Sequence, residues 1–131
     1  MVRILTAIIV LLLLFPLCSL GEEEVLIAVA SEGKTLKDSI SQVAGRCPYF
    51  IFIDSTGKIL EVVDNPYKDE GGSAGVSAAN FLTEKKVTLV VAEKFGSKMK
   101  NVLQTEEITC FEWEGIVEEA VKKILEKGAR I

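Results

Sequence analysis

The sequence lacks histidine entirely across its 131 residues. This absence excludes Ser-His-Asp triads, zinc sites with histidine ligands and acid–base catalysis by imidazole. Cysteine is also scarce, with three residues in the whole chain. Neither a Walker motif nor a G-x-G-x-x-G motif after a strand occurs. The common signatures of serine hydrolases, zinc enzymes and nucleotide-binding enzymes are therefore missing.

An excess of positive charge is missing too. The chain has 15 basic and 19 acidic residues, a net charge of −4. Arg3 is the one basic residue before Glu22, so the chain that follows has 14 basic and 19 acidic residues and a net charge of −5. This balance argues against nucleic acid as a partner.

A single long apolar run occupies residues 4–20, directly after Arg3. A basic start, an apolar centre and the small-x-small end Ser19-Leu20-Gly21 are typical of a signal peptide cleaved after Gly21. The run also reaches the minimum length of a retained membrane anchor, which is about 17 residues. Both interpretations place residues 22–131, as one domain, outside the cytoplasm, either secreted or anchored through residues 4–20.

Five short apolar segments follow, with the length and residue types of β-strands. They are Val25 to Ala30, Tyr49 to Asp54, Ile59 to Val63, Val87 to Ala92 and Ile108 to Trp113. Ser55-Thr56-Gly57-Lys58 is expected to join the second and third strands as a hairpin, which makes one of these two strands antiparallel to its neighbour.

Three further segments have apolar residues at helical spacing, namely Ser73 to Lys85, Ser97 to about Thr105 and Val117 to Lys127. Ser97 is expected to be the N-cap of the second helix. Leu36 to Val43 is predicted as a fourth, less regular helix. Continuous apolar strands interleaved with helices indicate a sheet covered on both faces, which is a three-layer α/β domain.

Three motifs in this order carry a family resemblance: Gly45-Arg46-Cys47-Pro48-Tyr49-Phe50, Gly71-Gly72-Ser73-Ala74-Gly75 and Glu93-Lys94-Phe95-Gly96. With the closing "VEEAVKKIL", the chain from Val25 to Leu125 resembles the dinitrogenase iron–molybdenum cofactor biosynthesis family, which includes small cluster carriers. The resemblance implies a ribonuclease-H-like α/β/α sandwich with a five-stranded mixed sheet, strand order 3-2-1-4-5 and strand 2 antiparallel.

That strand order would bring four segments to one edge of the sheet, where open α/β sheets bind ligands. These segments are Ser31 to Lys34, Cys47, Asn65 to Gly75 and Glu93 to Ser97. The residues predicted to bind a cofactor there are Arg46, Cys47, Gly71, Gly72, Ser73, Gly96 and Ser97. The charged residues around this edge have mixed signs, as a solvated rim does.

The glycines of this edge have two interpretations. Gly71 and Gly72 could let backbone N–H groups approach an anion at a helix start, or could simply turn the chain. Gly75 is interpreted as a packing residue, because Ala78 and Ala79 continue a small face toward the sheet.

Cys47 is the predicted metal ligand, because the neighbouring Arg46 would favour its thiolate. The alternative is a half-buried structural thiol. Cys110 is predicted to be in the core. A disulfide between them is not expected, since the implied order separates their strands by about 14 Å and a bridge needs Cα atoms within about 7 Å. Many family members carry histidines where this chain has Gln42 to Ala44 and Lys68 to Glu70, so possible cluster ligands are missing.

Two functions follow. The first is a non-enzymatic carrier of an iron–sulfur or iron–molybdenum-type cluster, which would exchange cargo with a donor or acceptor protein. The second is an exported protein-interaction or small-anion-binding domain without metal. Exposed edge strands make self-association possible. Catalysis of the ribonuclease H type is not expected, because the strand Val25 to Ala30 carries no carboxylate.

Overall fold

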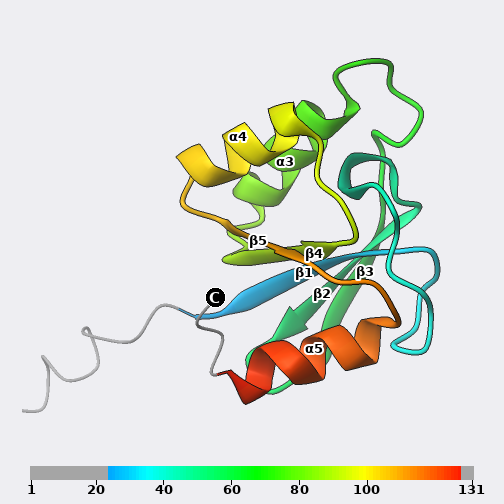
Figure 1. Cartoon of the computed structure of the whole chain (residues 1–131), viewed down its shortest axis with the longest axis vertical. Helices are drawn as coiled ribbons and strands as arrows, with labels where there is room; N and C mark the ends of the chain where they lie inside the picture. Colours follow the sequence, from blue (N-terminus) through cyan, green and yellow to red (C-terminus); the bar gives the residue numbers. More distant parts are fainter. Residues whose placement is uncertain (1–23, 128–131) are drawn as a thin grey trace, which may run out of the picture.

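The computed structural model describes residues 24–127, which form a five-stranded sheet with helices on both faces (Figure 1). The strand order is β3-β2-β1-β4-β5, and β2 is antiparallel to both of its neighbours. The pairs β1–β4 and β4–β5 are parallel. The predicted fold class, strand order and antiparallel strand are therefore confirmed. The strands are β1 (Leu26–Ser31), β2 (Tyr49–Asp54), β3 (Ile59–Asp64), β4 (Leu89–Ala92) and β5 (Thr109–Glu112).

The helices lie on opposite faces of this sheet (Figure 1). They are α3 (Ala74–Glu84), α4 (Ser97–Thr105) and α5 (Val117–Glu126), with a short 3-10 helix η1 (Ala44–Arg46) before β2. Alternate residues of each central strand point to the two faces. Thus Ala28, Phe50 and Val90 pack with α3 and α4, while Ile27, Ile51 and Val91 pack with α5.

The predicted helix from Leu36 to Val43 is wrong. Apart from one turn bond, from Asp38 N–H to Thr35 O, the backbone there bonds to neighbouring segments: Ile40 N–H donates to Gly115 O at 2.9 Å and Ser41 N–H to Ala30 O at 2.8 Å. Both residues are buried, so the segment is an extended cover over the ends of the sheet.

The hairpin between β2 and β3 is confirmed, and Gly57 has the positive φ of 90° that the turn needs. Asp54 Oδ1 accepts hydrogen bonds from the Thr56 hydroxyl and from the backbone N–H groups of Lys58 and Thr56, which lowers the pKa of its carboxyl.

The predicted signal peptide or anchor, residues 1–21, lies outside the described residues. Within residues 24–127, no helix has the length and apolar character needed to cross a bilayer.

Candidate binding site

A cavity of about 240 Å³ lies at the predicted edge of the sheet, where η1 and the first turns of α3 and α4 meet. Four of the predicted site residues line it, namely Arg46, Gly72, Gly96 and Ser97. Gly71 and Ser73 flank Gly72 in the chain but are not among the lining residues. The structure therefore brings three distant sequence motifs together around one space. The remaining lining residues are Val43, Gly45, Gly75, Val76, Lys98 and Met99.

Two helix starts supply unbonded backbone donors to this cavity. The first N–H groups of an α-helix have no acceptor within the helix. Among the described residues, no acceptor is bonded to the N–H groups of Gly75 and Val76 in α3, or of Ser97, Lys98 and Met99 in α4. All five residues line the cavity. The positive ends of two helix dipoles therefore meet there.

The N-cap of α4 differs from the prediction. Gly96 occupies that position with an extended backbone (φ −63°, ψ 149°), and Ser97 is the first helical residue. No side chain caps either helix start. A serine hydroxyl that bonded the N–H groups would have competed with a ligand, and none does so here.

The side chains that line the cavity carry charge of one sign. Arg46 and Lys98 are cationic, and no aspartate or glutamate is among the lining residues. The prediction of a mixed rim therefore does not describe the cavity itself. In a chain of net charge −4, this is a local positive site.

The glycines of the cavity fall into two kinds. A Cβ on Gly45 would lie 2.7 Å from the Cα of Gly75, and a Cβ on Gly75 would lie 3.1 Å from the Cβ of Met99. These two glycines permit close packing of η1, α3 and α4. Gly75 is therefore a packing residue, but it packs against α4 and η1 and not toward the sheet as predicted. A Cβ on Gly72 or Gly96 would meet no atom within 4 Å, and neither residue has a positive φ.

Cys47 does not line the cavity. Its side chain is 0% exposed and packs in the core between the sheet and α3. Burial raises the pKa of the thiol to about 12, despite a weak hydrogen bond from Asn65. The expectation that Arg46 would favour the thiolate is therefore wrong, because loss of hydration raises the pKa of the thiol and the charged group that acts on it is Glu32, which raises the pKa further. The role of Cys47 as a metal ligand stays a prediction.

Asn65 does not line the cavity but supports the segment beside it, and no local sequence pattern indicates this role. Its side chain is 2% exposed, and its Nδ2 donates to Gly45 O at 3.0 Å and Cys47 O at 2.9 Å. Its Oδ1 accepts Tyr67 N–H at 3.0 Å. The dipeptide Asn65-Pro66 predicts only a turn. The bonds to η1 depend on tertiary contacts that no local pattern encodes.

Cys110 lies on the edge strand β5, half-buried and packed against the same core as Cys47. Burial raises the pKa of its thiol. Both cysteines are free, as the strand order predicted.

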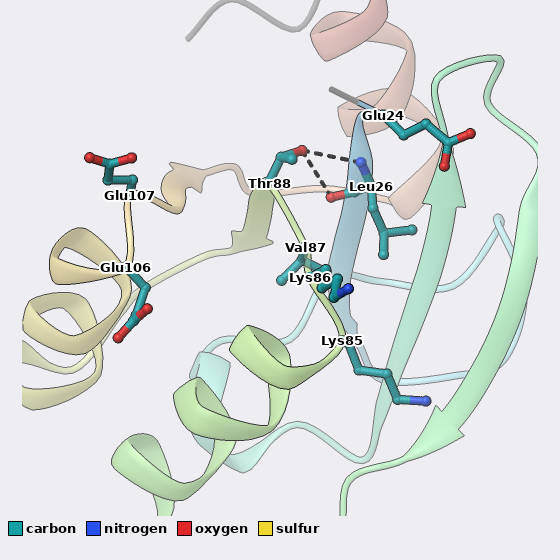
Figure 2. Close-up of a pocket in the computed structure, with 8 residues that line it drawn as sticks. All are labelled: Glu24, Leu26, Lys85, Lys86, Val87, Thr88, Glu106 and Glu107. Carbon is teal, nitrogen blue, oxygen red and sulfur yellow. Dashed lines mark hydrogen bonds between the residues drawn. The ribbon is translucent and has the colours of Figure 1, made fainter. Parts of the chain in front are cut away.

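A larger cavity, of about 580 Å³, lies at the opposite end of the sheet (Figure 2). Some of its polar side chains are already hydrogen-bonded or paired, and its charged side chains include both lysines and glutamates. Thr88 Oγ1 is bonded to both the N–H and the carbonyl of Leu26. Lys85 extends away from Glu106 and Glu107 in Figure 2 and pairs with Glu61 at 3.5 Å. By size alone, this cavity is the better candidate for a binding site. The smaller cavity is the better candidate by chemistry, because it is lined by residues whose backbone N–H groups are not hydrogen-bonded.

Metal ligation by side chains has little support in the described residues. No group of three or more cysteine, aspartate, glutamate or histidine residues lies close enough there to hold an ion. Any anion in the glycine-lined cavity would meet backbone N–H groups, Arg46 and Lys98.

The sheet order and the glycine motifs around the smaller cavity agree with the comparison with protein families. Residues 24–127 match the family model described as dinitrogenase iron–molybdenum cofactor, so the chain belongs to that family. Comparison with curated proteins finds no match.

Among solved structures, the apo form of the orange protein from Desulfovibrio gigas is similar, with 28% identity and a TM-score of 0.74 over 82% of this chain and 92% of that one. A candidate NifB protein from Thermotoga has 27% identity and a TM-score of 0.65, over 79% and 89% of the two chains. A candidate dinitrogenase from Methanocaldococcus jannaschii, at 15% identity, 81% and 92% coverage and a TM-score of 0.54, shows the shared fold alone.

Proposed function

We propose that this domain is a non-enzymatic carrier of an anionic metal–sulfur cluster, of the iron–sulfur or iron–molybdenum type, which it holds as cargo in the glycine-lined cavity. Membership of the dinitrogenase iron–molybdenum cofactor family and similarity to the orange protein support the class of cargo. The observation that carries the proposal is that two helix starts, whose first N–H groups have no backbone acceptor, line one cavity together.

The charge of the cavity supports an anion. Arg46 and Lys98 add two positive side chains to the two helix dipoles, and no carboxylate opposes them in the lining. Hydrogen bonds from such donors to an anion are charge-assisted and roughly twice as strong as neutral ones. A cation would find no carboxylate, thiolate or imidazole in this lining, where the neutral side-chain donors are the Ser97 hydroxyl and the Met99 thioether.

Gly72 and Gly96 support close approach of the cargo to the backbone. Neither glycine is required by its φ, and neither is packed against another atom. A side chain at either position would occupy open space beside the cavity. A ligand that needs this space, as at other backbone anion sites, would account for the missing Cβ at Gly72, while Gly96 is also favoured as the N-cap of α4.

Cys47 enters the proposal in a changed role. Its buried thiol, with a pKa of about 12, is held in the neutral form at physiological pH. Because only the thiolate binds metals well, we propose that the cargo is held by hydrogen bonds and charge instead of by a bond from Cys47 to iron.

Anaerobic reconstitution tests the proposal. The full chain is incubated with iron, molybdate and sulfide, desalted, and assayed for metal per chain and for sulfide-to-metal absorption. Wild type and Cys47→Ala are expected to retain equal amounts. Retention by wild type alone would establish thiolate ligation, and no retention by either would reject the carrier function in favour of the small-anion alternative.

We also propose that the domain works outside the cytoplasm and receives its cargo from, or passes it to, another protein. The apolar residues 4–20 after Arg3 support export. Fractionation of cells that produce the full chain tests this, and recovery in the cytoplasmic fraction would contradict it.

A further inference from the structure

The loop of residues 65–73, between β3 and α3, forms one wall of the cavity through Gly72. It is fastened to the segment of residues 45–47 at both of its ends. Asn65 fastens the first end and Arg46 the second, and the two fastenings differ in burial.

The Asn65 end is fixed. All the polar atoms of its side chain are bonded, and its backbone N–H donates to Pro48 O at 3.0 Å. Since the side chain is 2% exposed, opening this end would leave buried carbonyls without donors.

The Arg46 end is exposed to solvent. The guanidinium donates from Nη1 to Glu70 O at 2.9 Å and Lys68 O at 3.4 Å, and from Nη2 to Gly71 O at 3.0 Å. Gly71 O also accepts the N–H of Ala74, the first residue of α3, at 3.2 Å. One exposed side chain therefore holds both the end of the loop and the start of the helix.

We propose that Arg46 is a releasable latch that positions the Gly72 wall and thereby controls the width of the cavity. Its partners are carbonyl oxygens, which carry only partial charge, so an anion in the cavity competes for the same guanidinium. Release would free residues 66–73 while Asn65 holds the other end of the loop. This role rests on the proposed function only in naming the competing anion, because the latch exists without cargo.

A substitution can separate the two properties of Arg46, namely the hydrogen-bonding geometry of its guanidinium and its positive charge. Lysine keeps the positive charge, but its three N–H donors all sit on one nitrogen. It therefore cannot reproduce the planar fork in which Nη1 reaches Glu70 O and Nη2 reaches Gly71 O. If Arg46 is a latch, Arg46→Lys resembles Arg46→Ala. If Arg46 only contributes charge to the site, Arg46→Lys resembles wild type.

Hydrogen exchange of the full chain without cargo, read by mass spectrometry on peptides, tests the latch. The N–H of Glu70, bonded to Tyr67 O, and that of Ala74, bonded to Gly71 O, report on the loop. In Arg46→Lys and Arg46→Ala, the N–H groups of Glu70 and Ala74 are both expected to exchange at least tenfold faster than in wild type, and peptides of β1 and β4 are expected to be unchanged. Wild-type exchange of these two N–H groups in Arg46→Ala would overturn the latch.

Alkylation of Cys47 gives a second readout, with the half-buried Cys110 as reference in the same sample. The loop lies against the segment that contains Cys47. In both variants, the ratio of the alkylation rate of Cys47 to that of Cys110 should therefore be at least severalfold higher than in wild type. A ratio equal to that of wild type would contradict loop release.

The same variants are then loaded with iron, molybdate and sulfide. Equal loss of retained metal in Arg46→Lys and Arg46→Ala supports positioning, and full retention by Arg46→Lys overturns it. If wild type retains no metal, the carrier function fails, while the exchange result still decides whether the latch exists.

Discussion

The two ends of the sheet use glycine in opposite ways. At the end with the smaller cavity, Gly72 and Gly96 occupy ordinary backbone conformations with room for a side chain. At the other end, Lys86 (φ 62°) and Glu107 (φ 61°) directly follow the C-caps of α3 and α4, and both have conformations that favour glycine. Glycine thus stands where the backbone does not need it and is missing where the backbone would favour it.

This contrast separates folding from binding. Stability alone would place glycine after the C-terminal ends of α3 and α4 and alanine at position 72. Gly96 is the N-cap of α4, a position that favours glycine over alanine for folding as well. The cavity with glycines is also the one with unbonded N–H groups and uniformly positive lining, whereas the larger cavity in Figure 2 has mixed charges. We infer that Gly72, beside the smaller cavity, serves a ligand.

The largest effect is expected within the smaller cavity itself, where packed and open glycines lie side by side. Gly45→Ala would place a Cβ 2.7 Å from the Cα of Gly75, so we expect a loss of about 3 kcal/mol in the free energy of unfolding. Gly72→Ala is the matched control, with no such contact. Urea unfolding measures both, and equal stability of the two variants would mean that η1 and α3 are not in backbone contact.

The next effect concerns Cys47 and pH. Folding raises the pKa of this thiol from 9.0 to about 12, so above pH 9 the unfolded chain releases a proton that the folded chain keeps. The stabilisation is complete below pH 9 and is lost as pH rises toward 12. We expect wild type to lose about 2 kcal/mol more than Cys47→Ala between pH 9 and 10.5. Parallel pH profiles would show that Cys47 is accessible to water.

The smallest effect is expected from two substitutions that exchange the positions of glycine, Lys86→Gly and Gly72→Ala. Lys86→Gly relieves a left-handed conformation, and Gly72→Ala restricts the unfolded chain, so each should stabilise by about 0.5–1 kcal/mol. Thermal unfolding measures this. Destabilisation by Gly72→Ala would give that glycine a structural reason and weaken the contrast between the two ends.

The fold was predictable because its strands are short, apolar and bounded by clear turns, and because the family resemblance supplied their order. The segment from Leu36 to Val43 was not, since its apolar residues have helical spacing while its backbone bonds to β1 and to Gly115. Tertiary hydrogen bonds there override the local pattern.

The site was predictable in position but not in chemistry. The strand order placed Arg46, Gly72 and Gly96 at one edge, and the cavity is there. The burial of Cys47 and the role of Asn65 depend on how the loop folds over β2, which neither residue type nor spacing encodes.

Binding of the cluster to Gly72→Val and Gly71→Val tests the central claim most directly. Both glycines have open space where a Cβ would lie, but only Gly72 lines the cavity. With the free energy of unfolding measured in parallel, Gly72→Val should lower cluster affinity at least tenfold at unchanged stability, and Gly71→Val should bind as wild type does. Equal affinity of the two variants would contradict binding in this cavity.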